Sequence, residues 1–280
     1  IGGSDPLQNQ LILNWWRDWR NNDLSKEKIG EKGKTRKSSK KTNNMICYLT
    51  GQMIEPVSVA PKITGLANVG GLSMGDVLVG FDKDAFCSFG LEQAHNASIS
   101  EVSTREYVDK LNYLIRNHSR KLANALVVHW FKESVPQEND PLAFLFEPPE
   151  ITEAAALSSA RQILEAIRKG QRPTPTNNQY FALTISGASG RVMVRDWMEG
   201  SFEDLIVRID QWFSDLEIVS RDGGKLAHEP KFMAVCGAIV RDLKDLPAPT
   251  ATTLWRVALA GLPIPQPFIA QALARFRIDL

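Results

Sequence analysis

Cys47–Leu66 reads CYLTGQMIEPVSVAPKITGL, Val77–Ser100 reads VLVGFDKDAFCSFGLEQAHNASIS, and Ala125–Phe131 reads ALVVHWF. In the first two stretches, short apolar runs alternate with turns rich in glycine, asparagine and small polar residues. The third stretch is β-branched and aromatic, which is typical of a strand. This pattern predicts a scaffold that holds several loops in fixed positions, and such loops commonly carry binding residues.

The flanking sequence predicts an α+β fold, in which a mixed or antiparallel sheet has flanking helices and a mainly helical C-terminal part follows. Ser103 with Glu106 predicts a capping box, and Ser201 with Asp204 predicts a second helix start. The expected strands are Met45–Thr50, Asp76–Phe81, Asn124–Phe131, Gln179–Ser186 and Gly190–Trp197. The expected later helices are Glu153–Lys169, Phe202–Leu216, Phe232–Leu243, Thr250–Ala260 and Pro265–Arg277.

Changes in composition predict six parts along the chain. Trp15, Trp16 and Trp19 share one helical face, where they could stack on bases or, as helical spacing favours, pack into a core. Eight Lys/Arg between Lys26 and Lys41 form a basic run, either a tether for phosphates or a solvated loop. The parts are a leading helix (1–20), a basic flexible linker or loop (21–44), an α/β loop-presenting DNA-contact region (45–135), a connector (136–150), an α+β hairpin region (151–229) and a helical region (230–280).

The overall composition is that of an ordinary globular protein. The net charge is +1, with 43% hydrophobic and 23% charged residues, so a core can form without a disulfide or metal. Cys47, Cys87 and Cys236 are unclustered, which predicts reduced thiols and a cytoplasmic location. No stretch approaches the roughly 20 apolar residues of a membrane helix. The Ile1–Ser4 start, without an initiator methionine, leads us to expect an internal fragment of a longer protein.

Four short motifs in the first half have an order that can be compared with a known family. They are Cys47–Gly51 (CYLTG), Pro61–Gly65 (PKITG), Ala85–Gly90 (AFCSFG) and Asn96–Ser100 (NASIS). In this order they resemble the Cas8c/Csd1-like large subunit of the type I-C CRISPR surveillance complex, Cascade. A weaker likeness extends over most of residues 45–280.

The resemblance implies a non-catalytic nucleic-acid-binding subunit without a cofactor. It would sit at the 5′ end of the guide RNA (crRNA) beside Cas5-type and Cas7-type subunits, in a complex that also has a small helical subunit. It would recognise the protospacer-adjacent motif in target double-stranded DNA, help to open the duplex and dock the helicase-nuclease. The alternative is a protein-interaction scaffold with no direct DNA contact, which the near-neutral net charge favours.

Seven loop residues are candidates for DNA contact. Lys62 could touch a phosphate or a base edge, although surface lysines are common. The glycines of the Val69–Gly75 turn could let amide groups approach a phosphate, but the turn lacks the Gly-Lys-Ser/Thr of a Walker loop. Asn96 and Ser98 could read base edges or satisfy a turn backbone. The candidates are Lys62, Gly70, Gly71, Ser73, Gly75, Asn96 and Ser98.

Four arginines are candidates for RNA or subunit contact. Regular alternation along a strand would place Arg191 and Arg195 on one face, about 13 Å apart. Their guanidinium groups could hold phosphates there, or could instead pair with nearby carboxylates or a partner subunit. Arg275 and Arg277 could do the same or face solvent.

Catalytic and metal-binding motifs are missing from the sequence. The four histidines have no metal-ligand spacing, and His129, in an apolar strand, is expected to be an interior residue. Cys87 with Ser88 has no neighbouring base, and neither a nucleophile elbow nor a dinucleotide fingerprint is present. We therefore expect that the protein is not an enzyme and holds no metal. A hydrolase with an unrecognised site is the weaker alternative.

Overall fold

The computed structural model describes residues 10–26, 44–87, 90–136, 140–146, 178–219, 223–224 and 230–279. These residues belong to two separate units, Ile1–Asn43 and Asn44–Leu280. Most of the basic run and the helix expected at residues 153–169 lie outside the described residues.

The described part of the first unit is a single helix, α1 (Gln10–Lys26). It continues past residue 20, where the leading helix was expected to end. Its apolar side chains are exposed, at 79% for Leu11, 62% for Trp15 and 51% for Trp16. Trp15 and Trp16 are therefore not buried within the described part of their own unit.

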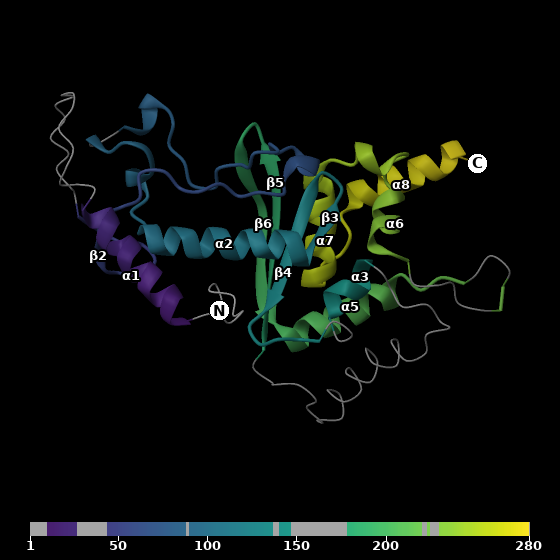
Figure 1. The fold of residues 1–280 in the computed structure, drawn as a ribbon. Helices are drawn as coiled ribbons and strands as arrows, with labels where there is room; N and C mark the ends of the chain where they lie inside the picture. Colours follow the sequence, from purple (N-terminus) through teal and green to yellow (C-terminus); the bar gives the residue numbers. More distant parts are fainter. Residues whose placement is uncertain are drawn as a thin grey trace, which may run out of the picture. The chain divides into compact units, whose positions relative to one another are not determined.

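A four-stranded antiparallel sheet organises the second unit (Figure 1). Its strands, in spatial order, are β3 (Ser119–Leu122), β4 (Ala125–Phe131), β5 (Gln179–Ala188) and β6 (Arg191–Ser201). The two central strands, β4 and β5, come from opposite sides of the connector expected at residues 136–150, so both sides contribute to one sheet. A separate short ladder joins β1 (Met45–Ile46) to β2 (Met53–Ile54).

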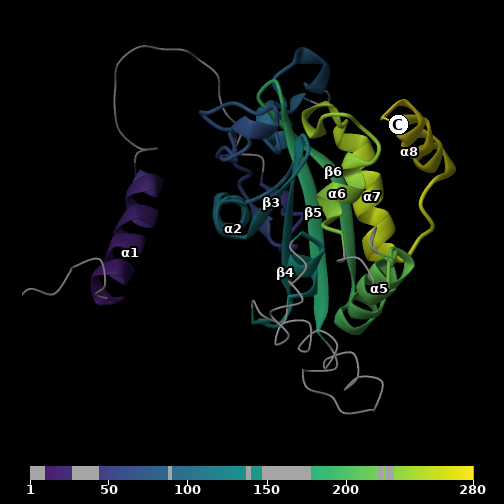
Figure 2. The ribbon, with the colours of Figure 1, turned by 90° about the vertical axis from the view of Figure 1, so that its right-hand side faces the viewer.

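Helices cover both faces of the sheet (Figure 2). One face carries α2 (Glu101–His118), and the other carries α5 (Phe202–Asp215), α6 (Phe232–Gly237) and α7 (Ala248–Ala260). The remaining helices are α3 (Pro141–Phe146) and α8 (Gln266–Asp279). This arrangement confirms the α+β prediction, with a helical C-terminal part.

Each face of the sheet supports its own hydrophobic core, because successive side chains of a strand point to opposite faces. On the α2 face, Ile185 of β5 packs in a cluster with Val108 and Ile115. On the other face, Tyr180 of the same strand packs in a cluster with Leu205 and Trp255. The sheet is therefore buried on both sides, and this rigid layer positions the loops at its ends.

Of three local sequence signals, one is confirmed and two are wrong. The helix start at Ser201 is confirmed, since its hydroxyl accepts a hydrogen bond from the Asp204 amide (3.1 Å). The capping box at Ser103 is wrong, because Ser100 caps α2 by accepting from the Ser103 amide (3.1 Å), so the helix begins earlier. The strand expected at residues 76–81 is also wrong, because Asp76 and Val77 form only isolated bridges to Ile63 and Arg191.

Candidate nucleic-acid interface

The tip of the β5–β6 hairpin is the centre of the candidate interface. Ser189 and Gly190 form a two-residue turn with φ angles of 49° and 88°. Positive φ at both positions is the requirement of the type I′ turn that fits hairpin twist. The turn is therefore tighter than the loop left between the expected strands, which were to end at Ser186 and resume at Gly190.

The glycine-rich turn packs directly against this hairpin through backbone contacts. A Cβ atom on Gly187 would lie 2.1 Å from the Cα of Gly71, and one on Gly70 would lie 2.7 Å from the Gly187 carbonyl oxygen. Both distances are shorter than any side chain could tolerate. Gly70, Gly71 and Gly187 therefore allow two backbones to cross, which is a packing role that the sequence alone did not suggest.

Several amides of the glycine-rich turn already have partners inside the protein. The Gly71 amide donates to the Leu66 carbonyl (2.9 Å), and the Leu72 amide donates to the Asp76 carboxylate (3.1 Å). Asp76 is fully buried, so a carboxylate lies beside these amides. This arrangement holds the turn in shape, and it leaves neither of these two amides available for a phosphate.

Lys62 lies beside this turn and presents an exposed side chain. Its neighbour Ile63 forms a two-way backbone bridge with Asp76 (2.8 Å each way). Asn112 of α2 then holds the same segment: its amide oxygen accepts from the Thr64 amide (2.8 Å), and its amide nitrogen donates to the Lys62 carbonyl (3.4 Å). Asn112 was missed in the sequence analysis. The signal for it is that asparagine is unfavourable inside a helix unless its side chain has a partner.

Asn96 and Ser98 differ in their exposure to solvent. Asn96 ends a short 3₁₀ helix (Gln93–Asn96), and its side-chain amide donates to the Gln93 carbonyl (3.0 Å). This is the second of the two roles considered for Asn96, in which its side chain satisfies the backbone of a turn. Ser98 is 1% exposed, and its carbonyl accepts from the Tyr48 amide (2.9 Å). A DNA contact by the Ser98 side chain is therefore excluded in this conformation. Ser73, in contrast, is exposed, whereas Gly75 is buried, and a Cβ atom on Gly75 would lie 2.9 Å from the Ile63 carbonyl oxygen.

A β-bulge separates the two arginines of β6. Thr184 pairs with Asp196 but Ile185 pairs with Val194, so Arg195 is the extra residue. The pairs from Arg191 to Val194 keep the expected alternation, and the bulge interrupts it at Arg195 itself. Arg191 forms an exposed ion pair with Asp82, whereas the Arg195 Nε donates to the Ser186 hydroxyl (2.8 Å).

The two C-terminal arginines also differ in their contacts. Arg275 donates from Nη1 to the carbonyl oxygens of Gly237 and Val240, at the end of α6. This contact ties α8 to α6, so at least part of the guanidinium group serves the fold. Arg277 lies in the last turn of α8 with an exposed side chain.

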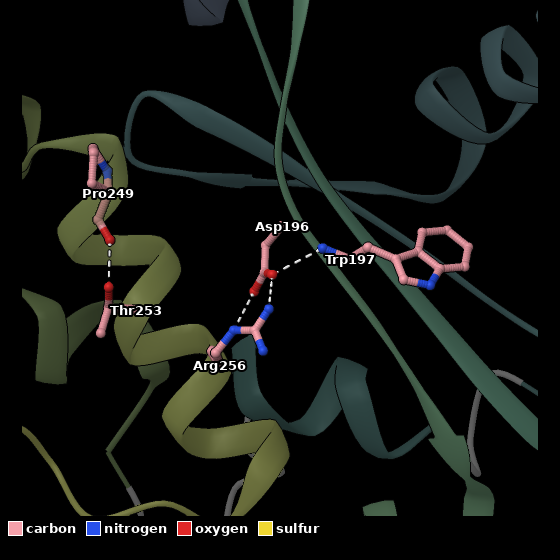
Figure 3. Close-up of polar contacts among 5 residues, drawn as sticks. All are labelled: Asp196, Trp197, Pro249, Thr253 and Arg256. Atoms are coloured by element: carbon pink, nitrogen blue, oxygen red, sulfur yellow. Dashed lines mark hydrogen bonds and ion pairs between the residues drawn. The ribbon is translucent and has the colours of Figure 1, made fainter.

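An ion pair ties β6 to α7 next to the bulge (Figure 3). Arg256 donates to both carboxylate oxygens of Asp196, with a distance of 3.0 Å between Nε and Oδ2. The Trp197 main-chain amide donates to the same carboxylate (2.9 Å). Asp196 directly follows Arg195 in the sequence, but its ion-pair partner lies 60 positions further along the chain.

A pocket of about 400 Å³ opens beside the hairpin tip. Its walls come from residues 58–60, 77–82, 93–94 and 189–193, and they are mainly apolar. Gln93, which has a left-handed φ of 51°, lines the pocket together with Asp82 and Arg191. An apolar pocket with a few polar groups is the usual form of a small-ligand site. The structure thus brings Arg191, the glycine-rich turn and Lys62 to one end of the sheet, together with the Asn96 loop.

The residues considered for catalysis have structural contacts. His129 is largely buried, and its Nε2 lies 2.7 Å from Asp140 Oδ2, while Asp140 Oδ1 accepts from the Leu142 amide (2.9 Å) at the start of α3. Cys47, Cys87 and Cys236 are free thiols, of which only Cys87 is exposed. Within the described ranges, no group of three His, Cys, Asp or Glu side chains could hold a metal ion. None of the described helices has the length and apolar character needed to cross a membrane.

Comparison with known proteins gives one family. The family model described as CRISPR-associated protein (Cas_Csd1) matches residues 16–280. The search of curated proteins found no match. The matched range contains the whole second unit, including the hairpin tip and the loops that pack on it.

Proposed function

This chain belongs to the Csd1 family of CRISPR-associated proteins, and from that membership we propose that it is a large, non-catalytic subunit of a type I-C Cascade effector complex. In this role it contacts the crRNA and the target double-stranded DNA, with Cas5-type and Cas7-type subunits and a small helical subunit as its neighbours in the cytoplasm. It reads the protospacer-adjacent motif, helps to open the duplex and docks the helicase-nuclease. Base pairing with the guide reads the remaining sequence.

The observation that carries this proposal is the family match over residues 16–280. The geometry at the hairpin tip supports a DNA-contact role for this end of the sheet. Backbone crossings and the Asn112 contacts fix the loops, so Lys62 is presented without a large loss of loop entropy on binding. A fixed loop that carries an exposed cation suits the recognition of a short duplex motif.

Electrophoretic shift of a target duplex by the assembled complex tests this role. We expect Lys62→Ala to weaken duplex binding and to reduce the slope of log affinity against log salt by about one, as for one lost phosphate contact. The matched control is Lys110→Ala, which removes an exposed lysine from α2. If both variants keep the wild-type affinity and slope, Lys62 does not contact DNA. Cleavage of the duplex by the purified chain with Mg²⁺ would contradict the non-catalytic assignment.

A protein-interaction scaffold is the second candidate, and the surface of α8 favours it. Leu273 is 59% exposed and Phe276 is 64% exposed. Both also line an apolar groove of about 340 Å³ between α8 and residues of α6 and α7. Exposed apolar patches of this kind commonly mark protein contacts. A scaffold of this class would assemble with the other subunits and show no duplex affinity at any salt concentration, whereas a DNA-contacting subunit loses affinity steeply as salt rises.

A further inference from the structure

The segments around the pocket beside the hairpin tip are held together in pairs by main-chain hydrogen bonds. The Val77 amide donates to the Gly190 carbonyl (2.9 Å), and the Val77 carbonyl accepts from the Val192 amide (3.0 Å). A third bond joins the Ala94 amide to the Ser58 carbonyl (3.0 Å). All five residues line the pocket, whose volume is about 400 Å³. The fold therefore sets the shape of the pocket before any ligand arrives.

The interior of this pocket is mainly apolar. One wall is formed by Val77–Val79 and Phe81, and the small side chains of Ala60 and Ala94, both buried, line it elsewhere. An apolar group that enters the pocket leaves water, which is favourable in proportion to the area removed. The volume lies within the usual range for small-ligand sites. The pocket therefore suits the apolar body of a small molecule.

Gln93 lines the pocket in a strained backbone conformation. Its φ of 51° lies in the left-handed region, which residues with a side chain rarely adopt. The Asn96 side chain, which donates to the Gln93 carbonyl (3.0 Å), and the Ala94 main chain hold this turn in place. Strained residues of this kind cluster at ligand-binding sites. The strain is thus a second observation, independent of the volume, that points to a ligand.

A cation lies in the wall of this pocket. Arg191 forms an ion pair through Nη2 with Asp82, and the two side chains are 44% and 67% exposed. The residues on both sides of Arg191 are bonded to Val77 through their main chains, so its backbone is fixed. Asp82 lies instead in the loop that follows this wall. Because a guanidinium group presents several donors in a planar fork, a ligand carboxylate can share Arg191 with Asp82 or replace it. The charge that the fold fixes here is therefore positive.

We propose that this pocket binds a small amphiphilic carboxylate, with its apolar body against Val77–Val79 and Phe81 and its carboxylate on Arg191. A medium-chain fatty acid has this chemistry, since its ionised head forms charge-assisted hydrogen bonds with a guanidinium group. A nucleic-acid strand is charged along its whole length and does not suit an apolar cavity with an arginine at one side. The inference therefore goes beyond the proposed function and does not depend on it.

Isothermal titration calorimetry of the full chain with octanoate tests this site. We expect one site with a dissociation constant on the order of 0.1 mM, as the limits on affinity for so small a ligand allow. The comparison ligands are 1-octanol and octylammonium, which have the same chain with a neutral or a positive head group. Both should bind about tenfold more weakly or worse, because neither forms the charge-assisted contact with Arg191.

Two variants and a matched control locate the binding. Arg191→Met keeps the aliphatic stem, and should weaken octanoate binding about tenfold while leaving 1-octanol binding unchanged. Val79→Asp places a carboxylate in the apolar wall and should abolish octanoate binding. The control is Arg105→Met, which removes an arginine of similar exposure (43%) from its ion pair with Glu101 on α2. It should bind octanoate as the wild type does.

The outcomes decide for or against the site. A wild-type chain that does not bind octanoate, equal affinities for octanoate and octylammonium, or an Arg191→Met variant with wild-type affinity would each overturn the inference. A loss in Arg191→Met that Arg105→Met does not share supports it. Circular dichroism of each variant checks that the fold is intact. If Val79→Asp does not fold, the three head groups and Arg191→Met still decide the question.

Discussion

Removing the guanidinium group of Arg256 should destabilise the second unit by leaving Asp196 buried without its charged partner. The Asp196 side chain is 7% exposed, and Arg256 supplies its only ion pair in the part of the chain described here. Substitution of Arg256 by methionine keeps most of the aliphatic stem and removes the charge. The Trp197 amide would then be the remaining neighbour that donates to this carboxylate.

The size of the effect follows from the unequal burial of the two partners. Breaking a fully buried pair costs about 3–5 kcal/mol, because the remaining charge is uncompensated. Arg256 is 49% exposed, so solvent screens part of the attraction and water can reach the vacated position. We therefore expect Arg256→Met to lower the free energy of unfolding by about 2 kcal/mol, below the buried-pair range.

Urea unfolding followed by far-ultraviolet circular dichroism measures this loss in a double-mutant cycle. The variants are Arg256→Met, Asp196→Asn and the pair together. We expect the double variant to be less destabilised than the sum of the single changes, with a coupling free energy of about 1–2 kcal/mol. A coupling below about 0.5 kcal/mol would refute the reasoning, since it would mean that the two side chains stabilise the fold independently.

Two further predictions concern stability. Gly187→Ala should cost about 3 kcal/mol, the upper part of the usual overpacking range, because its Cβ would meet the Gly71 backbone. The control is Gly237→Ala, whose Cβ would make only an ordinary contact of 3.7 Å with Leu243. Equal losses in urea unfolding would contradict this prediction. Burial raises the pKa of the Cys236 thiol from 9.0 to about 12. The unfolded chain therefore loses this proton first, so stability should fall above pH 9. The loss is about 1.4 kcal/mol at pH 10, and Cys236→Val should remove that part of the alkaline destabilisation; an unchanged pH profile would refute it.

Local signals in the sequence were sufficient for elements that depend on their own residues. The helix at Phe202–Asp215 was predicted within one residue, because its cap at Ser201 and its buried stripe both lie within the segment. The hairpin that includes β5 and β6 was predicted for the same reason. The type I′ turn lets β5 run two residues further than expected, to Ala188, because only Ser189 and Gly190 are needed to reverse the chain. The extra residues of β6 lie at its other end, from Met198 to Ser201.

The features that the sequence could not reveal depend on contacts between distant segments. The bulge at Arg195 follows from the register between two strands, which strand alternation cannot reveal. Ser98 is buried because its loop bonds to residue 48, and Gly71 is a packing glycine because the hairpin crosses it. Each of these outcomes requires a partner that is remote in sequence. The candidate loops could therefore be identified from the sequence, but the accessibility of each residue could not.

The pairing of β4 with β5 has a consequence for how this protein tolerates insertions and deletions between the two strands. Phe131 and Tyr180 are partners in the ladder, so the sheet closes over an intervening length of about fifty residues. The entropy of closing such a loop grows only with the logarithm of its length, and doubling the length would cost about 0.6 kcal/mol. A change of length in this stretch that spares α3, whose Leu142 and Leu145 belong to the core, should therefore cost little while the sheet on either side keeps its register.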